Sequence, residues 1–289
     1  MPGSLYIVAT PIGNLNDLSS RVKATFEKVD LILAEDTRVT IKLLNHLGVK
    51  KRMISCHEFN EKSRLGIITE FGQLNQSVAL VSDAGTPLIS DPGNDIVHQA
   101  INCSMNIVPI PGPNAGLLAL IASGLPCDRF VFEGFLPSKT NLLKARLAQL
   151  ESEERTIILY EAPHRLLKTL KALSEVFGDR DICLARELTK IHEEFVRGKV
   201  SKIISELSNA KLLGEYVIVI GGNNEDRSSL SPNKSEVENA IKEMLEDGAT
   251  IKTIVQTITE KYKVKRSEIY QLALAHKKPI NLSKTHKFT

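Results

Sequence analysis

Residues 5–15 of the chain read Leu-Tyr-Ile-Val-Ala-Thr-Pro-Ile-Gly-Asn-Leu, an apolar run that leads directly into a loop with one proline and one glycine. Residues 78–87 repeat the arrangement as Val-Ala-Leu-Val-Ser-Asp-Ala-Gly-Thr-Pro. Ligand sites in open α/β sheets form at the carboxyl ends of strands, where loops let the backbone approach a small molecule. Glycine permits a positive φ in such loops, and proline fixes the turn. The two loops therefore predict a small-molecule pocket beside an N-terminal sheet.

The first 125 residues alternate short apolar runs with amphipathic stretches. We expect strands at 5–9, 31–34, 78–81 and 107–110, and helices at 20–28, 40–47, 63–74, 95–102 and 115–123. This alternation predicts βαβ units and a mainly parallel sheet. The strand runs are apolar without polar alternation, which is typical of strands that are covered on both faces.

A break at 124–128, Gly-Leu-Pro-Cys-Asp, ends the domain predicted for residues 1–125. The following stretch predicts strands at 129–135, 156–160, 182–186 and 216–220, and helices at 141–150, 164–177 and 200–207. Residues 193–198 alternate like an edge strand. We therefore expect a second α/β domain over residues 126–222, with a sheet of mixed direction.

The polar segment 223–233 is typical of a linker. Beyond it, helices are expected at 235–246, 251–262 and 267–276, within a C-terminal extension over 234–289. The region from Lys261 to Lys287 carries eight basic residues and one acid, Glu268. Such a bundle resembles a helix-turn-helix module that binds nucleic acid, or it is a small helical cap on the second domain. The candidate RNA-binding residues are Lys261, Lys263, Lys265, Arg266, Lys277 and Lys278.

The composition is that of an ordinary globular protein, with 42% hydrophobic and 25% charged residues and a net charge of +3. The four cysteines show no CxxC spacing, so neither a metal site nor a disulfide framework is expected. The longest apolar runs, such as 117–122, fall far short of the about 20 residues that span a bilayer. The N-terminus lacks the charge pattern of a signal peptide. We expect a soluble, cytoplasmic protein with no membrane partner.

The loops narrow the choice of ligand. The first loop lacks both GxGxxG and GxxxxGK[ST], which argues against a dinucleotide or phosphate cradle. Asp83, just past the second strand, can accept hydrogen bonds from a ligand amine or a ribose hydroxyl. A third turn, Pro111-Gly112-Pro113, again follows an expected strand. Three such turns predict one shared pocket rim, although each alone is also explained as a simple tight turn.

Two strand ends of the second domain carry paired charges. Glu161 and Arg165 follow the strand at 156–160, and Arg186, Glu187 and Lys190 follow the next one. One interpretation is an ion pair at a domain interface. The other is a cleft in which the cations hold an anionic substrate backbone, since arginine binds phosphates in a bidentate manner. No GxSxG motif is present, so the sequence gives hydrolysis little support.

Five segments together resemble the small-subunit ribosomal RNA methyltransferase I family, of the tetrapyrrole-methylase-like superfamily of S-adenosylmethionine enzymes: 5–15, 34–38, 81–93, 111–115 and 160–165. The resemblance runs in order over residues 5–222. It implies two α/β domains of the class III methyltransferase type with S-adenosylmethionine bent into the cleft between them. It also implies a homodimer and 2′-O-ribose methylation of a cytidine in the decoding region of 16S rRNA, within the 30S subunit.

The resemblance further implies a donor site made of Pro11, Ile12, Gly13, Asp83, Gly85, Thr86, Pro87 and Ala115, with Tyr160, Glu161 and Arg186 from the second domain. A sulfonium donor needs no metal. A ribose hydroxyl is a weak nucleophile, so a general base or a nearby cation should help. The catalytic candidates are Glu161, Arg165, Glu187 and Lys190; Asp83 and Arg186 are further choices. The alternatives are a methyltransferase acting on a tetrapyrrole precursor and a non-catalytic RNA-binding assembly factor.

Overall fold

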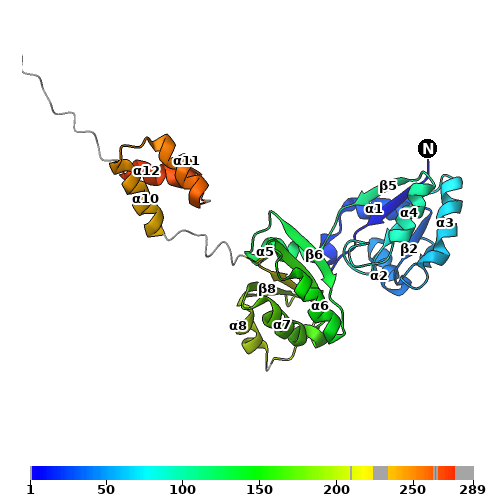
Figure 1. Cartoon of the computed structure of the whole chain (residues 1–289). Coiled ribbons are helices and arrows are strands. Elements are labelled where there is room, and N and C mark those ends of the chain that lie inside the picture. The colour runs from blue at the N-terminus through cyan, green and yellow to red at the C-terminus, as the bar shows by residue number, and fades with distance from the viewer. Residues whose placement is uncertain (1, 209, 224–233, 263, 265, 277–289) are drawn as a thin grey trace, which may run out of the picture. The chain divides into compact units, whose positions relative to one another are not determined.

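The computed structural model of the chain describes residues 2–208, 210–223, 234–262, 264 and 266–276 (Figure 1). Two compact units divide the chain, residues 1–223 and residues 224–289. The first unit holds two five-stranded sheets, and the described part of the second holds three helices. Among the described residues, no helix has the length and apolar character that crossing a bilayer requires.

The first sheet is parallel throughout and has the order β3-β2-β4-β1-β5. Its strands are β1 (Ser4–Val8), β2 (Leu31–Ala34), β3 (Met53–Ser55), β4 (Val78–Val81) and β5 (Asn106–Ile110). Every residue of β2 and β4 is buried, as expected for aliphatic strands with helices on both faces. The predicted parallel sheet is confirmed. The sequence did not predict β3, because three partly buried residues form no distinct apolar run.

Helices cover both faces of this sheet. On one face, α1 (Ser20–Lys28) and α2 (Thr37–Leu47) pack Phe26 and Leu44 onto the strands. On the other face, α3 (Glu61–Gln73) and α4 (Asn94–Asn102) contribute Ile68 and Ile96. A single-turn 3₁₀ helix, η1 (Leu15–Asp17), follows the first loop. With both faces covered, the carboxyl ends of the strands are left to carry the glycine and proline turns.

The second sheet has the order β6-β7-β10-β8-β9, and only its β6–β7 pair is parallel. Its strands are β6 (Phe130–Phe135), β7 (Thr156–Glu161), β8 (Asp181–Arg186), β9 (Glu194–Lys199) and β10 (Tyr216–Ile220). The predicted mixed direction is confirmed, and β9 is an edge strand as predicted. A β-bulge interrupts β6 between Phe132 and Gly134.

One face of the second sheet packs against three helices: α6 (Thr140–Leu150), α7 (Pro163–Phe177) and α8 (Val200–Leu207). The opposite face packs against α5 (Ala115–Ser123), which follows β5 in the chain. Ala119 and Leu120 of α5 share a core cluster with residues of β7, β8 and β10. The helix was predicted within the first domain, over residues 1–125, but its packing joins it to the second sheet.

The described part of the C-terminal unit contains α10 (Lys234–Glu246), α11 (Ile251–Tyr262) and α12 (Arg266–His276) around its own apolar core (Figure 1). Ile254 and Ile258 of α11 are buried in that core. Of the candidate RNA-binding residues, Lys261 and Arg266 are described. Lys263, Lys265, Lys277 and Lys278 lie outside the described residues, as does the predicted linker apart from Asn223.

Candidate functional site

Three turns lie side by side because β1 is flanked by β4 and β5, and each of these strands ends in one of them. Thr10 and Gly85 exchange two backbone hydrogen bonds, of 2.8 and 3.0 Å, which join the first two turns. The hydroxyl of Thr86 donates to the carbonyl of Pro113 at 3.0 Å and ties in the third. Gly85 has φ +81°, a conformation that favours glycine. The shared rim predicted from the sequence is therefore formed.

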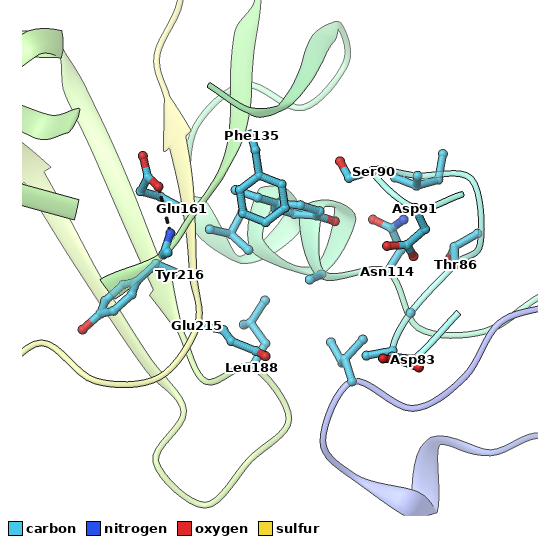
Figure 2. Close-up of a pocket in the computed structure, with 18 of the residues that line it drawn as sticks. Asp83, Thr86, Ser90, Asp91, Asn114, Phe135, Glu161, Leu188, Glu215 and Tyr216 are labelled. Carbon is cyan, nitrogen blue, oxygen red and sulfur yellow. Dashed lines mark hydrogen bonds between the residues drawn. The ribbon is translucent and has the colours of Figure 1, made fainter. Parts of the chain in front are cut away.

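A cavity of about 380 Å³ lies between this rim and the second sheet, at the edge where β7 ends. Figure 2 shows its two walls. The rim supplies the first wall, which includes Ile12, Glu35, Asp83, Gly85, Thr86, Asp91, Asn114 and Ala115. The second sheet supplies the other wall, which includes Phe135, Tyr160, Glu161, Leu188, Glu215 and Tyr216.

The charge of the lining is one-sided. Five carboxylates line the cavity, and among the described residues no lysine, arginine or histidine does so. The five are Glu35, Asp83, Asp91, Glu161 and Glu215. Apolar side chains, such as Ile12 and Leu188, fill much of the remaining lining. Such a cavity is suited to a ligand that carries positive charge and an apolar or aromatic body, and it disfavours phosphates.

Backbone amides orient two of the carboxylates on the first wall. Asp83 accepts the amide of Asp36 at 2.9 Å, and Glu35 accepts the amide of Asp83 at 3.1 Å. Partial burial raises the pKa of Asp83 above its ordinary value. Burial, followed by the nearby charge of Glu35, raises the pKa of Asp91 to about 6. These carboxylates lie where negative charge is costly, so a bound cation would stabilise them.

Tyr160 fixes one edge of the second wall. Its hydroxyl accepts the amide of Gly116, in the first turn of α5, at 3.1 Å. The ring makes edge-to-face contacts with Phe132 and Phe135 at centroid distances of 5.1 and 5.6 Å. Burial raises the pKa of Tyr160. The ring is thus held in place by packing and by the start of a helix.

Glu161 is built into the second wall. Its side chain is 1% exposed, and it accepts hydrogen bonds from the Thr169 hydroxyl and the Ala162 amide. The guanidinium of Arg165 lies 3.3 Å from the same carboxylate and donates to the carbonyl of Leu136 at 2.7 Å. Both carboxylate oxygens already have donors inside the protein. The pair therefore joins β7, α7 and the segment after β6.

Glu187 and Lys190 form a second internal network. Glu187 accepts hydrogen bonds from the Lys190 ammonium at 2.9 Å and from the Glu215 amide at 3.0 Å. The hydrogen bond from Lys190 lowers the pKa of Glu187. A side chain at Gly214 would meet the Glu187 carboxylate at 2.6 Å, so glycine permits this approach. The network holds Glu215 and Leu188 at the cavity.

Lys190 also connects the two walls. Its side chain lies against Gly13, where an added Cβ would come within 2.9 Å of the lysine Cε. Its ammonium pairs with Glu215 at 3.0 Å as well as with Glu187. Arg186, in contrast, donates to the Leu213 carbonyl at 2.9 Å and pairs with Glu194 at 3.3 Å. These cations are engaged by the protein itself.

The residues predicted from the sequence fall into two groups, those that line the cavity and those that surround it. Seven of them line the cavity: Ile12, Asp83, Gly85, Thr86, Ala115, Tyr160 and Glu161. The others do not line it and lie in the turns or networks around it: Pro11, Gly13, Pro87, Arg165, Arg186, Glu187 and Lys190. Their assignment to donor binding or catalysis stays a prediction.

Sequence reasoning missed several lining residues. The position of Asp91 shortly before α4 is compatible with a helix cap, but α4 has Gly93 at its N-cap position. The first amides of that helix, those of Asp95 and Ile96, are accepted instead by Glu61 of α3, at 2.7 and 3.2 Å. Asp91 is therefore left to face the cavity. Glu35 lay inside the recognised 34–38 segment, whereas nothing in the sequence singled out Phe135, Leu188, Glu215 or Tyr216.

Comparison with known proteins places this geometry in a family. A family model of tetrapyrrole (corrin/porphyrin) methylases matches residues 4–204. The uroporphyrin-III C-methyl transferase of Thermus thermophilus, complexed with S-adenyl homocysteine, superposes with a TM-score of 0.53. It is 16% identical and covers 76% of this chain and 97% of its own, which shows a shared fold.

Curated relatives are much closer in sequence. The ribosomal RNA small subunit methyltransferase I of Synechocystis sp. is 45% identical over 274 residues, which cover 94% of this chain and 98% of the relative. The protein of the same name from Bacillus subtilis is 41% identical and covers 93% of both chains. The one from Thermotoga maritima is 46% identical over 220 residues, which make up 76% of this chain but 99% of the relative.

The two sheets and the cleft between them define the class, a methyltransferase of the tetrapyrrole methylase type. Within that class, the chain belongs to the ribosomal RNA small subunit methyltransferase I family. The family, the fold and the use of S-adenosylmethionine predicted from the sequence motifs are confirmed at this level.

Proposed function

We propose that this chain transfers a methyl group from S-adenosylmethionine to the ribose 2′-hydroxyl of a cytidine in the decoding region of 16S rRNA. The relatives named above support an rRNA of the small subunit as the substrate. The observation that carries the proposal is the acidic cleft between the two sheets, because its charge matches a cationic donor. The specific nucleotide and the ribose position come from the resemblance of the sequence motifs.

The residues of the cavity fit the donor. S-adenosylmethionine supplies an electrophilic methyl group on a positively charged sulfur, together with an ammonium group and an adenosine. Asp83 lies where it can accept hydrogen bonds from the ammonium or the ribose, since its carboxylate is oriented by the amide of Asp36. Ile12, Leu188 and Tyr160 offer an apolar surface for the adenine. Holding the acceptor and the methyl group in line supplies much of the acceleration in such a displacement.

The same lining weighs against the alternatives. Tetrapyrrole precursors carry several carboxylates, which Glu35, Asp83 and Asp91 on the first wall would repel. Glu161 and Glu215 add little to this repulsion, because Arg165 and Lys190 pair with them. A non-catalytic assembly factor has no need of a formed donor cavity, and here hydrogen bonds join the three turns of its rim. Both arguments favour an enzyme whose acceptor is not a polyanionic small molecule.

The C-terminal unit is proposed to contact RNA. Arg266 and Lys252, both exposed, contribute basic groups from α12 and α11. Deleting residues 231–289 should weaken binding to 30S subunits and leave donor affinity unchanged. Normal methylation of 30S subunits by the truncated chain at physiological salt would contradict this role.

The direct test uses 30S subunits from a strain that lacks this protein. Incubation with the purified full chain and labelled S-adenosylmethionine should place one methyl group on 16S rRNA. Digestion and mass spectrometry should then identify a 2′-O-methylcytidine. A parallel reaction with uroporphyrinogen should remain unlabelled. Label in the tetrapyrrole, or none in the rRNA, would overturn the proposal. The homodimer and the cytoplasmic location stay predictions, testable by light scattering and cell fractionation.

A further inference from the structure

A second cavity, of about 570 Å³, adjoins the first. The two share Glu35, Ser90 and Asp91 in their linings, so these side chains form the boundary between them. The remaining lining of the second cavity comes from the segment between β3 and α3, including His57, Glu58 and Phe59. Glu35 and Asp91 are therefore two carboxylates of the first sheet's side that line both cavities, and the Glu35 carboxylate already accepts the amide of Asp83.

Phe59 is the most unusual residue of this lining. It is 91% exposed, although large aromatic side chains are normally covered. Its ring contacts the His57 ring edge-on, with centroids 6.1 Å apart. The His57 ring is itself held by the side chain of Asn60, at 2.9 Å. An aromatic ring that is exposed and supported at one edge offers its face to a flat partner, as in proteins that stack single-stranded bases.

The loop that carries Asp91 is strained. Leu88 and Ser90 have φ angles of +71° and +69°, which non-glycine residues rarely adopt. An added side chain at Gly134, in the bulge of β6, would meet the Ser90 hydroxyl at 2.6 Å. The loop of the first sheet thus comes against the bulge of the second. Strain of this kind is commonly stored where a side chain must be aimed at a ligand.

We propose that the second cavity receives the acceptor nucleoside, with Phe59 stacking on its base and Asp91 accepting the proton of its ribose hydroxyl. This inference rests on the proposed function, and it assigns the general base to Asp91 instead of the sequence candidates Asp83, Glu161 and Glu187. Glu161 is excluded from that role by the donors that already occupy both its oxygens, and Asp83 and Glu187 because neither lines the second cavity.

The proposed step balances as a simple displacement. A bond forms between the ribose oxygen and the methyl carbon while the carbon–sulfur bond breaks and leaves its electron pair on sulfur. The hydroxyl proton passes to the carboxylate of Asp91. The groups that face this carboxylate are Glu35 after β2, Ser82 and Asp83 after β4, and Tyr160 on β7; the Ser82 hydroxyl hydrogen-bonds to it and offsets part of the rise in its pKa. Two neighbouring negative charges and partial burial make Asp91 a better proton acceptor than an ordinary aspartate.

The chemistry of the lining favours a base and sugar over other ligands. Carboxylates such as Glu58 and Glu35 can accept hydrogen bonds from the amino group of cytosine and from sugar hydroxyls. They would repel a phosphate, so only the nucleoside part of the RNA fits here. Among the described residues, no group of three or more His, Cys, Asp and Glu side chains is placed to hold a metal ion. Glu61 is already bound to the start of α4.

The test combines kinetics with cross-linking, using the full chain and 30S subunits from a strain that lacks the protein. Asp91→Asn should lower kcat at least about 100-fold, the usual contribution of a general base, and leave the Kd for S-adenosylhomocysteine within threefold. Phe59→Ala should raise the KM for 30S subunits about tenfold, as expected for a lost stacking contact, with little change in kcat. Phe59→Trp should restore the KM.

Cross-linking reports the position without depending on turnover. p-Benzoylphenylalanine in place of Phe59 should cross-link 16S rRNA within a few nucleotides of the methylated cytidine. The same group in place of Leu74, an exposed residue just after α3, should not, and Leu74→Ala should match the wild type in kinetics. A kcat for Asp91→Asn within threefold of the wild type, or no cross-link from position 59, would overturn the inference. If the wild type itself leaves the subunits unmethylated, the proposed function fails instead.

Discussion

The two walls of the donor cleft are built in opposite ways. On the first sheet, backbone hydrogen bonds join the turns, and the carboxylates of Asp83 and Asp91 face the cavity with raised pKa values. On the second sheet, ion pairs and hydrogen bonds of side chains hold the wall together. Glu161 and Glu187 are bound by Arg165 and Lys190 and by backbone amides.

This difference shows how to distinguish charged residues that bind the ligand from charged residues that stabilise the fold. Charged residues on the second wall are already satisfied inside the protein, so removing them should change stability first. Charged residues on the first wall are kept in a costly environment, so removing them should first change donor binding or turnover and leave the fold intact or improved. The following predictions, from the largest effect to the smallest, test that division.

Glu161→Ala should lower the free energy of unfolding by about 3–5 kcal/mol, because it leaves the buried donors of Thr169 and Arg165 without their acceptor. Urea denaturation followed by circular dichroism measures the change. Glu215→Ala is the matched control, since its carboxylate is 79% exposed and should cost less than about 1 kcal/mol. Equal effects of the two variants would show that the buried contacts of Glu161 do not support the fold.

Asp83→Asn should weaken binding of S-adenosylhomocysteine by roughly 10- to 100-fold, in line with the loss of a charged hydrogen bond worth about 1.5–3 kcal/mol. The melting temperature should change little, because asparagine can still accept the amide of Asp36. Calorimetry gives the affinity. Arg186→Gln serves as the comparison: its side chain bonds Leu213 and Glu194 and does not line the cavity. A larger loss of affinity from Arg186→Gln than from Asp83→Asn would contradict the proposed contact between Asp83 and the donor.

Asp91→Asn should stabilise the fold at neutral pH by about 1–2 kcal/mol, a value discounted because water still reaches part of the carboxyl. Its pKa in the folded state is about 6, against a usual value of 3.8, so the folded state binds the proton more tightly. The wild type therefore loses stability as the pH rises from about 4 through 6, and the variant does not.

Denaturation at pH 7.5 and pH 4 measures this effect, and the two proteins should converge at the lower pH. Asp36→Asn should have the opposite effect and destabilise the fold at pH 7.5. The reason is that hydrogen bonding to Arg38 lowers the pKa of Asp36 to about 2, so its charged form is favoured in the folded state. An Asp91→Asn variant that is less stable at pH 7.5 would show that the carboxylate supports the fold and is not held ready for a ligand.

The sequence predicted most of the fold because many of its strands are apolar runs of four to six residues, and β1, β4 and β5 lead into turns with glycine and proline. The resemblance of its motifs also implied that Asp83 and Tyr160 belong to one site, and both residues line one cavity. The sequence could not predict which charged side chains face the cavity and which are bound by other groups of the protein. Arg165 and Lys190 follow strands as plainly as Asp83 does, but only their three-dimensional partners reveal that they are internally bound.

The role of Asp91 could not be predicted either, because it depends on a contact between segments that are distant in the sequence. Asp91 lies three residues before α4, close enough in sequence to suggest a cap, but a glutamate from another helix accepts the first amides of α4. Pairings between segments more than thirty residues apart leave no local pattern. Packing of α5 on the second sheet was missed for this reason too, because its apolar sequence is compatible with either sheet.

The position of α5 has a consequence for synthesis on the ribosome. This helix is apolar on nearly every side, and β10, one of the strands that cover it, ends at Ile220. At roughly 5–20 residues per second, the nascent chain carries an uncovered apolar helix for several seconds before its sheet is complete. Interruption of translation between β5 and β10 should therefore leave a product that aggregates or is captured by chaperones, even though the first sheet can already form.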